Sequence, residues 1–133
     1  MAGTVTQAST TEVDHIKVAT LTCTGDSSDG SYPATTLTVI PRNETGGRLL
    51  QIITDPGATA PTDNWDVTLT NGGGDMLLGL GANRDTANTE VAVLNSNGAY
   101  PVYAGTDTLI LNISGNSVNS AGIVIRVYYT EGV

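Results

Sequence analysis

Turn-forming residues interrupt this sequence roughly every eight to fifteen residues, and the runs between them are short and rich in Thr, Val, Ile and Leu. Gly, Pro, Asn, Asp and Ser form turns because they adopt or stabilise backbone conformations that other residues avoid. The β-branched residues between them favour extended strands. We therefore expect an all-β protein, a single-domain antiparallel β-sandwich or jelly roll with about eight or nine strands.

The clearest strand is the run WDVTLT, in which Trp65, Val67 and Leu69 alternate strictly with polar residues. A period of two places these three side chains on one face, so we predict that they belong to the core. A tryptophan with this parity is more often a core residue than a platform for sugar rings. Glycines in residues 71–75 (NGGGD) favour a hairpin that leads into a strand at residues 76–80.

The remaining strands are predicted from similar runs, at residues 13–24, 34–41, 49–54, 90–95, 100–103, 108–114 and 123–129. The run at 49–54, LLQIIT, is apolar on both faces, which is typical of a central strand. In the strand at 90–95 we expect Val91 and Val93 to face inward. Periodicity does not give strand order, so a simple sandwich and a jelly roll both remain open.

Residues 1–12 are predicted to form a flexible N-terminal arm that precedes a β-sandwich domain at residues 13–133. The arm is rich in Thr and Ser, and Val5 is its only large apolar residue after the initiator, so it gains little from burial. Two interpretations remain: a frayed chain end, or an arm that becomes ordered against a neighbouring subunit.

The formal net charge is -8, with 13 acidic residues against five Lys and Arg. Nucleic-acid binding depends on cations that release counterions from phosphates, so no nucleic-acid partner is expected. A cationic partner, a divalent ion or solubility alone would each suit this sign. No apolar run approaches the roughly 20 residues of a membrane helix, and the first residues lack the pattern of a signal peptide. We therefore expect no membrane association. We also expect the protein to be synthesised in a cytoplasm.

Candidate chemistry is sparse. His15 is the single histidine, without a nucleophile signature beside it, so a surface or packing role is expected. Asp63, Asp66 and Asp75 lie near one another in sequence and could form a carboxylate pair for glycoside hydrolysis or a calcium site, but turn capping and solubility explain them better, and DxDxDG spacing is absent. Cys23 is the single cysteine and is expected in the core. We predict no enzyme activity, no cofactor and no metal.

Residues 55–90, DPGATAPTDNWDVTLTNGGGDMLLGLGANRDTANTE, resemble a segment of small proteins encoded among the virion structural genes of tailed bacteriophages. The shared pieces are a Pro-Gly loop at 56–57, an acidic aromatic strand at 65–69, a Gly/Asp turn at 72–75, a leucine-glycine strand at 77–81 and an ANRDT connector at 82–86. The resemblance covers about a quarter of the chain.

Among such proteins, the chain is most similar in size and composition to capsid decoration (cement) proteins. The resemblance implies a non-enzymatic homotrimer that binds the major capsid protein on the exterior of the virion head and stabilises the shell, after synthesis in the bacterial host cytoplasm. The residues proposed to contact the capsid or a neighbouring subunit are Val5, Thr6 and Gln7 in the N-terminal arm, together with Tyr100 and Tyr103. The two tyrosines are included because tyrosine is favoured at interfaces. The alternative is a fibre, neck or tail module that binds carbohydrate or a receptor.

Overall fold

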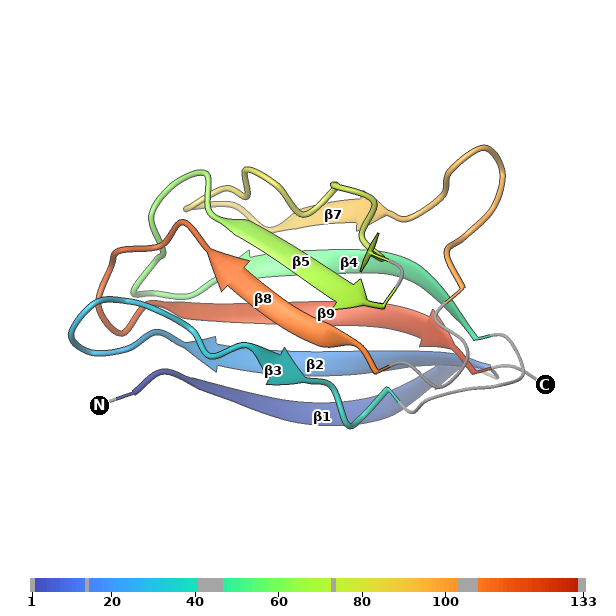
Figure 1. Cartoon of the computed structure of the whole chain (residues 1–133), viewed down its shortest axis with the longest axis horizontal. Helices are drawn as coiled ribbons and strands as arrows, with labels where there is room; N and C mark the ends of the chain where they lie inside the picture. The colour runs from blue at the N-terminus through green and yellow to red at the C-terminus, as the bar shows by residue number, and fades with distance from the viewer. Residues whose placement is uncertain (1, 14, 41–46, 73, 103–107, 132–133) are drawn as a thin grey trace.

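The computed structural model describes residues 2–13, 15–40, 47–72, 74–102 and 108–131. In this part of the chain the expected all-β fold is confirmed, with nine strands and no helix (Figure 1). The strands are β1 (Thr4–Val13), β2 (Ile16–Thr24), β3 (Thr35–Thr36), β4 (Arg48–Pro56), β5 (Asp66–Asn71), β6 (Gly74–Asp75), β7 (Glu90–Val93), β8 (Ile110–Ser114) and β9 (Gly122–Thr130).

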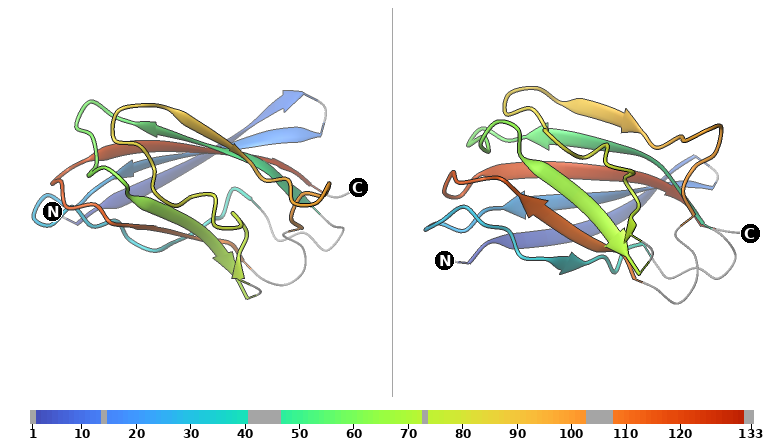
Figure 2. Two further views of the ribbon diagram at one scale, coloured as in Figure 1. Left: turned by 90° about the horizontal axis from the view of Figure 1, so that it is seen from above. Right: turned by 45° about the horizontal axis from the view of Figure 1, so that its top comes forward.

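The strands form two sheets, which Figure 2 shows as two layers. The large sheet has the order β1-β2-β9-β4-β7, and the small sheet has the order β3-β8-β5-β6. Every pairing between these strands is antiparallel. The chain changes sheet at most connections after β2, so most neighbours within a sheet, apart from β1 with β2 and β5 with β6, are distant in sequence. The result is an antiparallel β-sandwich.

The core lies between the two sheets and is built on β9, the middle strand of the large sheet. Its alternate residues are buried: Ile123, Ile125, Val127 and Tyr129. They belong to one cluster with side chains from the small sheet, Val67, Leu69 and Leu111 among them. Burying a side chain of this size contributes about 1.5–3 kcal/mol. The period of two along each strand therefore decides which face points inward.

Trp65 lies just before β5 and has 0 % of its surface exposed. Its indole Nε1 donates to the carbonyl oxygen of Asp85 at 3.3 Å, which gives the buried ring a hydrogen-bond partner. The backbone of Trp65 also forms a bridge with Arg84. Trp65 therefore holds the connector before β7 against the sandwich.

The hairpin after β5 differs from the predicted one because its second strand, β6, contains two residues. Residues 76–80, predicted as a strand, form turns instead. The Asp75 carboxylate accepts hydrogen bonds from the backbone nitrogens of Leu69, Leu77 and Gly79, at 3.1, 3.0 and 3.1 Å. Side-chain capping of this kind competes with strand pairing, and the φ of 56° at Leu78 is incompatible with an extended strand through residues 76–80.

The inward face predicted for the strand at 90–95 was wrong. Val91 and Val93 are 57 % and 53 % exposed, whereas Ala92 packs against the core and Leu94 is fully buried. The register is set by pairing with β4, including a 2.8 Å hydrogen bond from the Leu94 nitrogen to the Leu50 carbonyl. Both faces carry apolar residues, and the larger Leu94 occupies the core.

Most of the predicted N-terminal arm is a strand. β1 pairs with β2 from Thr4↔Thr24 to Val13↔Ile16. The Gln7 side chain donates to the Thr36 carbonyl at 3.0 Å and accepts from the Thr38 nitrogen at 2.8 Å. The order of this segment comes from backbone pairing and these polar contacts, which a count of apolar residues does not register.

Candidate interaction surface

The outer face of the large sheet is the side turned away from the core, and aligned side chains cross it. One row runs through Val18, Tyr128, Gln51 and Val93, which are successive register partners on β2, β9, β4 and β7. Although it faces outward, Val18 is 2 % exposed. Neighbouring side chains on the outer face therefore shield Val18 from solvent.

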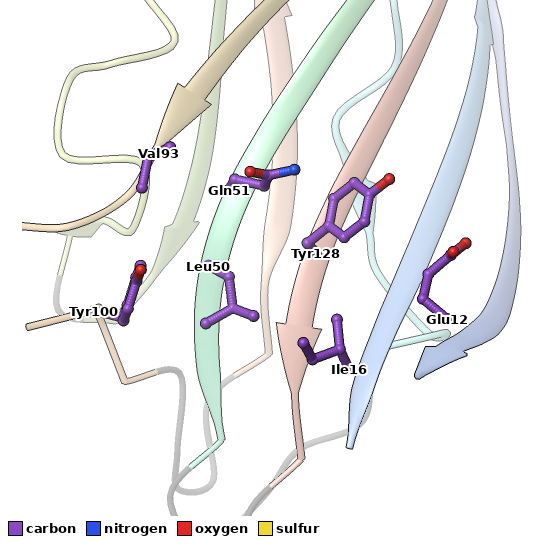
Figure 3. Close-up of a pocket in the computed structure, with 7 residues that line it drawn as sticks. All are labelled: Glu12, Ile16, Leu50, Gln51, Val93, Tyr100 and Tyr128. Atoms are coloured by element: carbon purple, nitrogen blue, oxygen red, sulfur yellow. The ribbon is translucent and has the colours of Figure 1, made fainter. Parts of the chain in front are cut away.

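A hollow of about 400 Å³ lies on this face (Figure 3). Its lining comes from all five strands of the large sheet and from the loop after β7. Figure 3 shows Glu12, Ile16, Leu50, Gln51 and Tyr128 on the strands β1, β2, β4 and β9, with Val93 and Tyr100 on the far side. The lining is mostly aliphatic and aromatic, with one carboxylate.

Irregularities in the large sheet shape the hollow. The register of β4 against β9 shifts between Leu49 and Gln51, which leaves Leu50 as an extra residue. Leu49 is fully buried in the core and Leu50 lines the hollow, so two neighbouring leucines serve opposite faces. The register of β1 also shifts between Thr11 and Val13, at Glu12. β-Bulges commonly redirect side chains in this way.

Of the charged side chains around the hollow, the cations have partners within the molecule, whereas Glu12 forms no ion pair with a described residue. Glu12 is exposed, and no ion pair among the described residues involves it. Lys17, which follows the hollow residue Ile16, pairs with Glu131 at 3.3 Å. Arg48 donates from Nη1 to the carbonyl oxygen of Tyr100 at 3.1 Å. The lining residues of the hollow therefore include a carboxylate and no cation.

The β7 edge beside the hollow is apolar. Val91 and Val93 on β7 have 57 % and 53 % of their surfaces exposed, and Val102, which forms a β-bridge with Arg48 of β4, has 42 % exposed. In the described part of the chain, β7 pairs with β4 on one side and with no strand on its other side. Apolar side chains on an unpaired edge mark a surface that another chain can cover.

The residues predicted to contact the capsid or a subunit are spread over different environments. Thr6 is exposed on β1, whereas Val5 packs against the core and Gln7 binds residues 36–38 of its own domain. Tyr100 lines the hollow. Tyr103 lies outside the described residues.

The residues considered for catalysis or metal binding have structural partners or lie apart. His15 is exposed in the turn between β1 and β2. Asp63 accepts from the Thr86 nitrogen at 3.3 Å, and Asp66 accepts from the Asn83 nitrogen at 2.9 Å. Among the described residues, no group of three or more His, Cys, Asp or Glu could hold a metal ion. The same part of the chain contains no helix long and apolar enough to cross a membrane.

Cys23 is buried in the core, where desolvation raises the pKa of its thiol to about 12. Burial also raises the pKa of the neighbouring Tyr32, whose hydroxyl donates to the Ala121 carbonyl at 2.9 Å. The thiolate is the reactive form of cysteine. At neutral pH this side chain is therefore an inert part of the core.

Ile16, Leu50, Gln51 and Val93 were missed as interaction residues, because the hollow needs the register of five strands at once. Two sequence signals point toward it. The apolar parity changes between Ile16 and Leu21, and the run at 49–54 is apolar on both faces. Both patterns show that the outer face of these strands also carries apolar side chains.

No protein-family model matches the sequence, and no curated protein matches it. The fold is similar to that of a chain in a solved structure titled "Cyanophage Pam1 capsid asymmetric unit", with a TM-score of 0.52 and 16 % sequence identity. The similarity covers 87 % of this chain and 84 % of that chain, so the two chains are of similar length. At this identity, the comparison shows a shared β-sandwich fold.

Proposed function

We propose that this chain is a non-enzymatic bacteriophage virion protein that decorates the exterior of the head. In this role it binds the major capsid protein as a homotrimer and stabilises the shell. The observation that carries the proposal is the fold shared, over nearly the whole length of both chains, with a chain from a capsid asymmetric unit. The resemblance of residues 55–90 to small virion proteins supports the same role independently.

The winding of the chain supports the proposal further. Leaving out β1, the order β2-β9-β4-β7 in one sheet faces β3-β8-β5-β6 in the other. We interpret this order as a jelly roll, in which eight strands form two Greek keys. Viral capsid and lectin domains both use this architecture, so the fold agrees with a virion role without specifying a ligand.

The edges and the charge of the molecule are consistent with a trimer on an outer surface. β1 and β7 are the two edges of the large sheet, and subunit contacts would cover edges that otherwise invite aggregation. A homotrimer engages several capsid sites together, which gives tight attachment from weak individual contacts. A net charge of -8 would also keep the exterior from adsorbing nucleic acid.

The structural use of the carboxylates supports a non-enzymatic role. Asp75 caps the turn after β6, and Asp85 accepts hydrogen bonds from the backbone nitrogens of Ala87 and Asn88. These hydrogen bonds lower the pKa of Asp85. A carboxylate held ionised as a turn cap suits structure better than general acid catalysis near neutral pH.

The role is tested by adding the purified protein to phage heads that lack it and locating the bound copies by electron microscopy. Density at threefold or quasi-threefold positions, with many copies per head and a trimeric mass in solution, is the expected result. A few copies confined to one vertex or to the tail would contradict head decoration and favour the neck, tail or fibre alternative.

The carbohydrate-binding alternative loses one of its proposed contacts, because Trp65 is fully buried. Tyr100 and Tyr128 remain half-buried in the hollow. Truncating Trp65 tests this assignment, since a core residue lowers the melting temperature when truncated, whereas a sugar platform loses glycan binding at an unchanged melting temperature.

A further inference from the structure

The hollow on the large sheet combines aromatic, aliphatic and acidic side chains in one place. Tyr100 and Tyr128 are half-buried, so part of each side chain faces solvent. Ile16 and Leu50 supply aliphatic surface beside Tyr128 (Figure 3). Glu12 contributes an exposed carboxylate at the β1 side. A volume of about 400 Å³ falls within the range of small-ligand sites and suits one long side chain better than a folded surface.

This combination is complementary to a cation with an apolar stem. Arg and Lys side chains lay their methylene groups on apolar surface while the charged head stays near water or a carboxylate. An aromatic ring attracts such a head through its electron-rich face. Among the described residues Glu12 forms no ion pair, so none of their cations competes for its carboxylate.

We propose that the hollow binds an arginine or lysine side chain presented by a partner protein. The stem would lie against Ile16 and Leu50, and the head would contact the Tyr128 ring and the Glu12 carboxylate. Arginine is expected to bind more tightly than lysine, because its planar guanidinium stacks on aromatic rings and is less strongly hydrated. The net charge of -8 favours the approach of a basic partner.

Among the described residues, the cations of a second copy are already engaged, which favours a different chain as the partner; Arg42 lies outside the described residues. Three cations among the described residues form ion pairs within the molecule: Lys17 with Glu131, Arg84 with Glu90, and Arg126 with Asp55. Arg48 donates to the Tyr100 carbonyl. The described part of the chain therefore has no disengaged cation to offer a neighbouring copy. This inference goes beyond the virion role, which leaves the chemistry of the contact unspecified.

The inference is tested by titrating the full-length protein with acetyl-Gly-Arg-Gly-amide and following backbone amide shifts by NMR. A second titration uses the same peptide with citrulline, which keeps the shape of arginine and removes its charge. Saturable shifts at Glu12, Gln51, Val93 and Tyr128 are expected, with binding of the arginine peptide at least about threefold tighter. Equal binding of both peptides would overturn the proposal.

Matched variants separate local recognition from the general attraction of an acidic protein. Glu12→Gln is expected to weaken binding about threefold, whereas Asp29→Asn, with the same change in net charge at the opposite end of β2, leaves it unchanged. The amide oxygen of the substituted side chain can still accept the 2.9 Å hydrogen bond that the Ser31 nitrogen donates to Asp29, so the control preserves its loop. An equal effect of the two variants would show non-specific attraction and contradict the site.

Two substitutions of Tyr128 test the aromatic contribution. Tyr128→Phe keeps the ring and is expected to bind the arginine peptide as the unmodified protein does, whereas Tyr128→Leu weakens binding about threefold. Circular dichroism checks that both variants fold. Equal affinity of the two variants would contradict a role for the ring. Peptide binding and head binding are separate measurements, so either proposal can fail alone.

Discussion

The two edges of the large sheet differ in how they are stabilised. β1 is ten residues long, and its outward side chains pair with those of β2 as Thr4 with Thr24 and Thr6 with Thr22. β7 is four residues long and presents Val91 and Val93 to solvent. The β1 edge is polar and tied to its own domain through Gln7, whereas the β7 edge leaves apolar surface next to the hollow. The comparison separates a polar edge held to its own domain from an apolar edge that, in the described part of the chain, is free for an outside partner to cover.

Deleting residues 2–12 is expected to have the largest effect. It removes most of the β1–β2 ladder and the contacts of Gln7, so the free energy of unfolding should fall by at least about 3 kcal/mol, at roughly 1 kcal/mol for each lost hydrogen bond. Chemical denaturation followed by circular dichroism measures the loss. An unchanged midpoint would show that this segment is an arm after all.

Leu94→Ala should cost about 2–4 kcal/mol, because it leaves a cavity in the core beside β7. Its matched control is Val93→Ala on the opposite face, which should change the free energy of unfolding by less than about 1 kcal/mol, as expected for an exposed site. Both values come from the same urea titration. The reverse order would mean that β7 presents its other face to the core.

Gln7→Ala is expected to destabilise the domain by about 1–2 kcal/mol, because it removes the hydrogen bonds to the Thr36 carbonyl and the Thr38 nitrogen. Thr6→Ala changes the adjacent, outward position and should stay within about 0.5 kcal/mol. Thermal melts of the two variants, measured side by side, provide the comparison. Similar losses would mean that the side-chain contacts of Gln7 contribute nothing beyond strand propensity.

The double substitution of Val91 and Val93 by threonine should have the smallest effect on folding. Threonine keeps the β-branched shape, so the free energy of unfolding is expected to change by less than about 0.5 kcal/mol. Association with heads, or with other copies, should weaken because the edge loses apolar surface. Sedimentation and head-binding assays measure this. Unaltered association would remove the β7 edge from the interface.

Sequence patterns were informative where one face of a strand is apolar and the other polar. The alternation from Trp65 to Leu69 assigns the inward face directly, since the opposite positions carry Asp66, Thr68 and Thr70. In β7 the pattern is ambiguous because valines alternate with Ala92 and Leu94, and the register with β4 decides between the faces. β1 has few apolar residues, and its order depends on a partner strand rather than on its own composition.

The hollow depends on still more distant relations. Glu12 and Val93 lie on opposite sides of it, and they are brought to one face only when five strands pair in a particular order. The extra residue at Leu50 arises from a register shift that no local pattern specifies. Turn spacing gives the class of fold, but sites assembled across a sheet require its topology.

The burial of Cys23 makes this chain its own reporter of unfolding. Val5 on β1 is the register partner of Cys23, so a thiol-specific dye can reach the sulfur only after the strands around it separate. The rate of labelling then follows opening events in the native state, without denaturant and without an engineered cysteine. The burial of Cys23 has a second use, because Cys23 is the single cysteine of the sequence. A cysteine engineered at an exposed position such as Val91 would be the single fast-reacting thiol.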